Sequence, residues 1–385
     1  MPKDTEPTAH LRVGVVGGGQ LARMMAESAR NLPLTLCVMG GDSSDSAADF
    51  AAEFSLGSPH SAHDLALFAG QVDCLTFDHE LVNLDAVDAL TRDGHHVYPT
   101  ADSLRFAVHK AYQRATLAAS GILGPAFAVL EEFDDDEFDI FAAVTERVPV
   151  VKADHGGYDG RGVLVSDSLD EARNFAQRVG SSSHILLEEP VDIVAEVAVI
   201  VVTSRNGERV AYPPVLTRQV DGMCVEVSYP AGLDPAILNE CSLIADRVAD
   251  VTGTVGVLAV ELFVTTTDVV LNEVATRPHN SGHWTIEGAV TSQFENHLRA
   301  VAGWPLGDTT PTSAFVTMVN VVGSERPGDP HAALAIPGAH IHDYGKSWRP
   351  GRKLGHVTVC GDDDSVVSRA WMAAEALGTS ARRKP

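Results

Sequence analysis

Residues 256–301, the segment most informative about the fold, read GVLAVELFVTTTDVVLNEVATRPHNSGHWTIEGAVTSQFENHLRAV. Two apolar, β-branched runs at 257–264 and 269–274 flank four polar residues, a pattern typical of a β-hairpin. Each run carries one acidic residue, Glu261 in the first and Glu273 in the second. Carboxylates are rare in strands because burial of an unpaired charge is costly. We therefore expect a compensating group next to these two carboxylates.

The sequence allows two registers for the pairing of the two hairpin strands. An uninterrupted pairing sets Glu261 opposite Asn272 and turns Glu273 to the other face, whereas a bulge or a longer loop sets Glu261 opposite Glu273. Two facing carboxylates repel unless a cation lies between them. Oxygen ligands of this kind suit Mg²⁺ or Mn²⁺, with nucleotide phosphates completing the coordination. The alternative is a half-exposed hairpin with two solvated glutamates.

A polar loop, RPHNSGHW, follows the hairpin at residues 277–284. It contains Arg277 and His279, and it leads into a predicted helix over 292–301. A loop rich in donors for anions beside a candidate metal site favours phosphate chemistry.

Composition excludes several classes of protein. A chain of 385 residues with 45% hydrophobic and 21% charged residues is expected to form two or three globular domains. The sequence has no secretory pattern and no apolar run of about 18 residues, so we expect a cytoplasmic protein without a membrane partner. Five scattered cysteines without C-x-x-C spacing argue against a disulfide framework or a cysteine-based zinc site. The formal net charge of −24 argues against general nucleic-acid binding.

A glycine-rich turn, Gly17 to Gly19, separates a predicted strand at 11–16 from a predicted helix. With Ala22 it fits the relaxed dinucleotide-binding fingerprint. Such a turn also serves any anion at a helix N-terminus, or only packs a helix against a sheet. Further strand patterns at 34–39, 72–77 and near Val97 predict a small parallel α/β domain.

The middle of the chain contains the segments that favour a nucleotide site. A predicted helix over 103–119 is basic, and a strand over 148–152 ends in Lys152. The loop that follows, to residue 162, has four glycines whose amides can approach phosphates, although it lacks the G-K-[ST] ending of a Walker A loop. Two further strands are predicted, one at 184–187 that ends in two glutamates and one at 194–202 that contains Glu196. The region 211–222 is less regular, and its prolines predict an edge of a sheet or a connection.

The order of these pieces resembles that of the ATP-grasp enzymes. Within them, GGGQLARMM, VKADHGGYDGRG, the hairpin with its RPHNSGHWT loop, and RPGRKLGH resemble the family of 5-(carboxyamino)imidazole ribonucleotide synthases over nearly the whole chain. The resemblance implies an α/β and α+β protein with an ATP-grasp fold. It divides the chain into a Rossmann-like N-terminal domain (1–98), an ATP-grasp domain with its lid (99–302) and a small β-rich C-terminal domain (303–385).

The resemblance also implies residue roles. Lys152 and the glycine-rich loop would hold the phosphates of ATP, the segment 188–191 its adenine and Glu196 its ribose. The full implied ATP site comprises Arg105, Lys152, Gly156, Gly157, Tyr158, Asp159, Gly160, Arg161, Gly162, Glu188, Glu189, Pro190, Val191, Glu196, Gln219, Asn272 and Glu273. Glu261 and Glu273 would bind Mg²⁺ or Mn²⁺. The implied site for aminoimidazole ribonucleotide comprises Gln20, Glu80, Tyr158, Asp159, Arg161, Arg352 and Lys353.

Catalysis is implied for Arg277 and His279, which would orient bicarbonate and its phosphorylated form, and for Lys353. The implied reaction carboxylates aminoimidazole ribonucleotide with bicarbonate in purine biosynthesis and consumes ATP through carboxyphosphate. This chemistry needs charge neutralisation more than a protein nucleophile, which suits an inventory of Lys, Arg and carboxylate groups. Gln219 stands where the family commonly has a histidine.

Alternative functions require different groups in the site. Within the fold they are a formate-dependent glycinamide ribonucleotide transformylase and a biotin carboxylase-like enzyme. Outside it, a nicotinamide-dependent oxidoreductase depends on the Gly17 to Ala22 turn alone, and an ATP-sensing regulator would lack the metal and bicarbonate groups. The family resemblance suggests a homodimer whose partners are otherwise small molecules.

Overall fold

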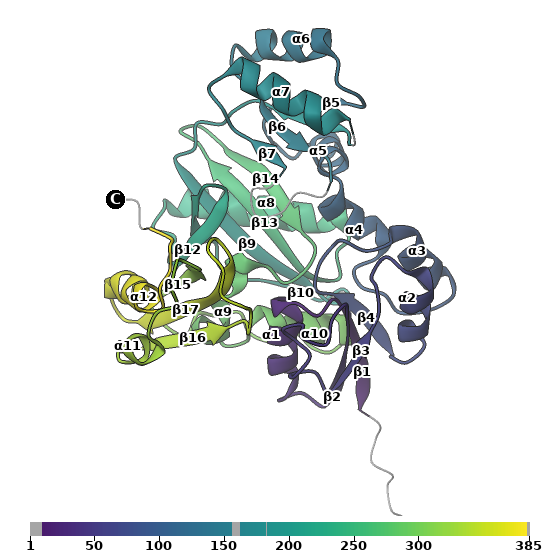
Figure 1. Ribbon diagram of the computed structural model, residues 1–385, viewed down its shortest axis with the longest axis vertical. Helices are drawn as coiled ribbons and strands as arrows, with labels where there is room; N and C mark the ends of the chain where they lie inside the picture. The colour runs from purple at the N-terminus through teal and green to yellow at the C-terminus, as the bar shows by residue number, and fades with distance from the viewer. Residues whose placement is uncertain (1–9, 156–161, 182, 383–385) are drawn as a thin grey trace, which may run out of the picture.

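The computed structural model describes residues 10–155, 162–181 and 183–382. Three β-sheets organise these residues, and helices pack against the sheets (Figure 1). No helix in this part of the chain is long and apolar enough to cross a membrane.

The first sheet is the parallel sheet predicted for the start of the chain. Its elements are β1 (Leu11–Val16), α1 (Gln20–Ala29), β2 (Leu34–Gly40), β3 (Glu53–Leu56), α2 (Ala62–Ala69), β4 (Cys74–Phe77) and α3 (Leu84–Arg92). The strand order is β3-β2-β1-β4, and β1 pairs in parallel with both neighbours. Alternate residues of β1 and β2 enter two different apolar clusters, so both faces of the sheet are covered. The strand predicted near Val97 is only a single bridge to Leu75.

The glycine-rich turn before α1 holds a carboxylate of the chain itself. Asp78, just after β4, is 5% exposed and accepts hydrogen bonds from the backbone N–H groups of Gly19 at 2.5 Å and Ala22 at 3.2 Å. A Cβ atom on Gly19 would collide with this carboxylate. The N-terminus of α1 is therefore filled where the dinucleotide fingerprint would receive a pyrophosphate, which argues against the oxidoreductase alternative.

The prediction of a single helix over 103–119 is wrong, because the chain forms two helices there, α4 (Ala101–Val108) and α5 (Lys110–Ala119). His109 between them has extended backbone angles, φ −113° and ψ 102°. Asp154 makes the break favourable: its carbonyl accepts from Lys110 N at 2.9 Å and its Oδ1 accepts from Ala111 N at 2.8 Å. A residue 43 positions further along the chain thus caps a helix start that no local signal marks.

The second and largest sheet has nine strands. Its elements and the helices around them are β9 (Ala195–Thr203), β10 (Arg209–Ala211), β11 (Val215–Val220), β12 (Met223–Tyr229), α8 (Pro235–Thr252), β13 (Gly256–Val264), β14 (Val269–Ala275), the short 3₁₀ helix η1 (Asn280–Gly282), α9 (Thr285–Gly288), α10 (Gln293–Ala302), β15 (Phe315–Val322), α11 (Pro330–Leu334), β16 (Ala339–Asp343), β17 (Lys353–Gly361) and α12 (Ser365–Ala376). The order is β14-β13-β9-β11-β12-β15-β17-β16, with β10 on β9. Because β12 pairs with β15, the sheet continues past residue 302 into the C-terminal part of the chain.

The region 211–222 was expected to be an edge or a connection, and this expectation is wrong. Strand β11 lies inside the sheet, between β9 and β12. Pro213 and Pro214 precede the strand instead of interrupting it, so they remove no hydrogen bond from the ladder.

The third sheet forms the upper lobe of Figure 1 together with two helices. Its elements are β5 (Phe127–Leu130), α6 (Asp135–Thr145), β6 (Val150–Ala153), β7 (Val163–Leu164), α7 (Leu169–Gly180) and β8 (Ile185–Glu188). The order is β5-β8-β6-β7, all antiparallel. Apolar residues of α6 and α7 pack on it in a separate small core.

His297 on α10 joins the first sheet to the second. It is fully buried, and burial lowers the pKa of its imidazole to about 3, so the ring is neutral. Its Nδ1 accepts from Val257 N at 3.0 Å, so the proton lies on Nε2, which donates to Thr76 Oγ1 at 2.8 Å. These two bonds tie β4 to the start of β13, and they fix the hairpin relative to the N-terminal sheet.

We predict that Gly19→Ala lowers the free energy of unfolding by about 1–3 kcal/mol, because the added methyl group must displace the buried Asp78 carboxylate. Urea unfolding followed by circular dichroism measures the change. Gly41→Ala is the matched control, since nothing lies within 4 Å of its added Cβ. Equal unfolding midpoints for the two variants would show that a methyl group at position 19 does not displace the Asp78 carboxylate.

Candidate functional site

A cavity of about 450 Å³ lies where the first and second sheets meet. Its walls come from the turn before α1, the segment after β4, strands β11 to β14, the loop after β14 and the start of β17. Eight residues predicted from the sequence line it: Gln20, Glu80, Gln219, Glu261, Glu273, Arg277, His279 and Lys353. Segments more than 300 residues apart in the sequence thus contribute to one site.

The hairpin adopts the bulged pairing, one of the two that the sequence left open. Pairing runs regularly from Val264 with Val269 to Leu262 with Leu271, and then shifts so that Glu261 pairs with Glu273. Asn272 is the extra residue of this β-bulge. Both glutamates consequently lie on the face that lines the cavity.

Arg114 on α5 fixes the bulge. Its Nη1 and Nη2 donate to the carbonyls of Leu271 at 2.7 Å and Asn272 at 2.8 Å, and its Nε donates to Glu188 Oε1 at 2.6 Å. The Arg114 side chain is only 4% exposed, so these bonds form with little competition from water. One guanidinium thereby links α5, the bulge and strand β8.

The two facing glutamates are charged differently. Burial, together with the charge of Glu273, raises the pKa of Glu261 to about 7. Burial also opposes ionisation of Glu273, but an ion pair with Lys110 holds its pKa below the ordinary value. His279 Nδ1 lies 3.9 Å from Glu261, yet burial and Arg277 lower the pKa of this imidazole to about 4, so it supplies no positive charge. Near neutral pH, Glu273 therefore has a directly paired cation, whereas for Glu261 burial and the facing Glu273 outweigh the attraction of Lys353 and Lys110.

Arg277 and Glu80 form one ion pair in the cavity wall, although the resemblance assigned them to different substrates. The guanidinium donates from Nε and Nη2 to both carboxylate oxygens of Glu80. Burial opposes ionisation of Glu80, but the Arg277 charge and hydrogen bonds lower its pKa to about 2. Both groups are thus charged and held in a fixed orientation.

Gln293 at the start of α10 holds the loop that carries His279. Its Oε1 accepts from His279 N at 3.0 Å, and its Nε2 donates to His279 O at 2.7 Å. Gln293 is fully buried, so both bonds are shielded from water. Sequence reasoning missed this residue because a glutamine in the first turn of a helix has no distinctive pattern.

Three cations and two carboxylates gather beside the bulge, around a space of about 10 Å³. Lys152 Nζ lies 2.6 Å from Glu188 Oε2, while Arg114 holds the other oxygen. Lys110 completes the group through Glu273. The sequence predicted Lys152 and Glu188 here but treated Lys110 and Arg114 as part of a basic helical face. Their i,i+4 spacing, which places both on one side of α5, was the available signal.

The other described residues predicted for the ATP site lie around these groups. Glu189, Pro190 and Val191 follow β8 and are partly exposed, and Glu189 N donates to Ala126 O. Burial raises the pKa of Glu196 on β9 to about 7.

Two predicted arginines make local contacts. Arg105 on α4 pairs with Asp102 at 3.0 Å and its side chain is 41% exposed. Arg352 donates to the carbonyl and hydroxyl of Ser347. Gly162 precedes β7 with φ +78°, while Gly156, Gly157, Tyr158, Asp159, Gly160 and Arg161 lie outside the described residues.

Comparison with family models divides the chain into three matches. Residues 11–108 match the ribonucleotide synthetase preATP-grasp domain, residues 115–294 the ATP-grasp domain, and residues 316–370 the phosphoribosylaminoimidazole carboxylase C-terminal domain. The ATP-grasp fold expected from the sequence is therefore confirmed.

Comparison with individual proteins agrees with the family models. The chain is 43% identical over 379 residues to the N5-carboxyaminoimidazole ribonucleotide synthase of Mycobacterium tuberculosis, covering 95% of this chain and 87% of the relative. The crystal structure of the corresponding synthetase from Thermus thermophilus superposes with a TM-score of 0.87 at 32% identity, covering 97% of this chain and 100% of that one. The Aspergillus clavatus synthase in complex with ADP and 5-aminoimidazole ribonucleotide superposes with a TM-score of 0.88 at 29% identity, covering 96% and 99%.

We predict a specific pH dependence for the stability of the ligand-free protein. Glu261 has an ordinary pKa of 4.5 when unfolded and about 7 when folded, so between these values only the folded state holds the proton. This contribution is complete below pH 4.5 and is lost as the pH rises through 7. Glu261→Gln should therefore gain about 1–3 kcal/mol relative to wild type between pH 5 and pH 7.5. Urea unfolding at several pH values measures the difference, and a constant difference would contradict the raised pKa.

Proposed function

The chain belongs to the N5-carboxyaminoimidazole ribonucleotide synthase family, and on this premise we propose that it carboxylates 5-aminoimidazole ribonucleotide with bicarbonate, in purine biosynthesis. ATP is consumed, and ADP and phosphate are released. The observation that carries the proposal is the cavity in which a facing pair of glutamates, an arginine and a neutral histidine line one wall. The relative from Aspergillus clavatus, in complex with ADP and 5-aminoimidazole ribonucleotide, supports the choice of substrates.

Glu261 and Glu273 hold a divalent cation, Mg²⁺ or Mn²⁺. The fit follows from their charges, since burial and the facing Glu273 raise the pKa of Glu261 to about 7, and a cation between the two carboxylates would offset this repulsion. Carboxylate oxygens are the ligands these ions prefer. The bound ion neutralises charge on the phosphates of ATP.

The chain's own groups bind and orient the reacting anions. Lys152 and the glycine-rich loop hold the phosphates of ATP, the segment 188–191 the adenine and Glu196 the ribose. Arg277 orients bicarbonate and its phosphorylated form, carboxyphosphate, with Glu80 fixing the plane of its guanidinium. His279 is neutral, so its imidazole donates or accepts a hydrogen bond without adding charge. Transfer of this kind depends on positioning and charge stabilisation.

Aminoimidazole ribonucleotide occupies the part of the cavity nearest Gln20 and Lys353. Lys353 contributes a positive charge close to His279 and Glu261, as its effects on their pKa values indicate. Arg352 and the loop residues Tyr158, Asp159 and Arg161 complete the site for this substrate.

The remaining features of the proposal come from the family resemblance. The chain divides into domains at 98/99 and 302/303, it acts as a homodimer, and it acts in the cytoplasm. Sedimentation velocity tests the oligomeric state.

The activity itself predicts a double substrate requirement. Phosphate release from ATP should need both bicarbonate and aminoimidazole ribonucleotide, and labelled bicarbonate should enter the nucleotide product. A coupled phosphate assay with each substrate omitted in turn measures this. Stimulation by formate and glycinamide ribonucleotide instead would assign the chain to a different ATP-grasp activity.

Glu273→Gln should lower the turnover number about 100-fold or more, because one metal-binding charge and the partner of Lys110 are lost together. High Mg²⁺ should restore part of the activity. Asp268→Asn, in the exposed turn of the same hairpin, is the matched control and should behave as wild type. Unchanged turnover of the Glu273 variant at ordinary Mg²⁺ would remove this carboxylate from the metal site.

A further inference from the structure

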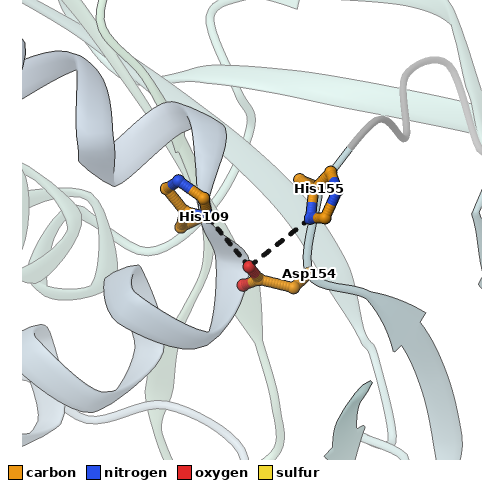
Figure 2. A group of neighbouring side chains, drawn as sticks. All are labelled: His109, Asp154 and His155. Atoms are coloured by element: carbon orange, nitrogen blue, oxygen red, sulfur yellow. Dashed lines mark hydrogen bonds and ion pairs between the residues drawn. The ribbon is translucent and has the colours of Figure 1, made fainter. Parts of the chain in front are cut away.

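A second cluster of metal-binding side chains lies at the junction between α4, α5 and the end of β6. His109 and His155 each turn a ring nitrogen toward the carboxylate of Asp154 (Figure 2), and one potential ligand atom from each of the three residues lies within 4.8 Å of the other two. His109 Nδ1 is 2.9 Å and His155 Nδ1 is 3.8 Å from Asp154 Oδ2. The cluster is separate from the glutamate pair and none of its members lines the 450 Å³ cavity.

The distances suit a small cation with nitrogen ligands. Tetrahedral Zn²⁺, with ligand bonds of about 2.0–2.1 Å, separates neighbouring ligand atoms by about 3.3 Å. The two measured separations, 2.9 and 3.8 Å, lie on either side of this value. The His155 side chain is 50% exposed, so it can close the remaining gap, and water can supply the fourth ligand.

Asp154 is prepared for this role by its second oxygen. Oδ1 accepts from Ala111 N at 2.8 Å, which orients the carboxylate and leaves Oδ2 toward the two imidazoles.

A simpler role, stabilisation of the break between α4 and α5, accounts for only part of the cluster. It explains the contact between His109 and Asp154. It does not explain why His155 Nδ1, which forms a hydrogen bond with the hydroxyl of Ser183 at 3.3 Å, also lies 3.8 Å from Asp154 Oδ2. Two imidazole nitrogens and one carboxylate oxygen within 4.8 Å of one another form a set of donor atoms that one ion could bind.

We propose that His109, Asp154 and His155 form a binding site for a transition-metal cation of the Zn²⁺ class. Two imidazole nitrogens and one carboxylate oxygen favour Zn²⁺ or Co²⁺ over Mg²⁺, which prefers oxygen ligands and water. The site thus differs in chemistry from the Mg²⁺ site proposed at Glu261 and Glu273, and it does not depend on the proposed reaction. Two of the ligands are close in sequence to the lysines of the nucleotide site: His109 precedes Lys110, and Asp154 lies two residues after Lys152.

The test uses the full chain without an affinity tag, in millimolar Mg²⁺ with ADP so that the nucleotide site is occupied. Competition with a chromophoric chelator measures Zn²⁺ binding, and we expect one Zn²⁺ per chain. Co²⁺ should give the intense visible absorption of a four-coordinate ion. His155→Ala should weaken Zn²⁺ binding about 10-fold or more and abolish the Co²⁺ band.

His331→Ala is the matched control, because His331 is equally an exposed imidazole but lies on α11, outside the cluster. It should bind Zn²⁺ as wild type does. Asp154→Asn provides a second variant, since an amide oxygen can still accept from Ala111 N while the negative charge is lost; it should also bind weakly. Equal Zn²⁺ affinity in wild type and His155→Ala, or no Zn²⁺ bound by wild type, would overturn the proposal.

Discussion

The site depends on the guanidinium of Arg114, which holds two successive carbonyls of the hairpin and the carboxylate of Glu188 at once. By fixing the carbonyls of Leu271 and Asn272, it stabilises the bulge that moves the hairpin register by one residue. Without the bulge, Glu273 would point to the opposite face of the sheet from Glu261, because side chains alternate along a strand. The facing pair of acids, and with it the candidate metal site, follows from this one buried contact.

Three carboxylates around the site are paired with cations, whereas Glu261 and Glu196 have raised pKa values. Glu273 pairs with Lys110, Glu188 with Lys152 and Arg114, and Glu80 with Arg277. The pKa of Glu261 is raised instead, because burial and the nearby Glu273 and Glu196 outweigh the positive charges of Lys353 and Lys110. In a chain with a formal net charge of −24, these local pairs are what allow anionic substrates to approach. The unbalanced carboxylate then favours a cation at the same place.

Long-range contacts assemble the cavity from distant parts of the chain. His297 ties β4 to β13, Gln293 fixes the backbone of His279, and the continuous nine-stranded sheet brings Lys353 beside the hairpin. Asp78 fills the N-terminus of α1, so the glycine-rich turn serves packing within the first domain and not a dinucleotide. The contacts of His297, Gln293 and Asp78 are made by buried polar groups, which fix the relative position of the parts more strictly than apolar packing does.

Period-two apolar patterns and turn residues predicted the hairpin and many of the strands, and long motifs such as RPHNSGHWT carried the resemblance that implied the ATP-grasp fold and the family, because these are local properties of the chain. The sequence also predicted eight of the residues that line the cavity. The register of the hairpin, the break at His109 and the importance of Lys110 and Arg114 emerged from the tertiary structure alone. The register depends on an arginine 157 positions away, and the break depends on a capping carboxylate 43 positions away. Local periodicity specifies which elements form, but it contains no information about which distant charge will complete them.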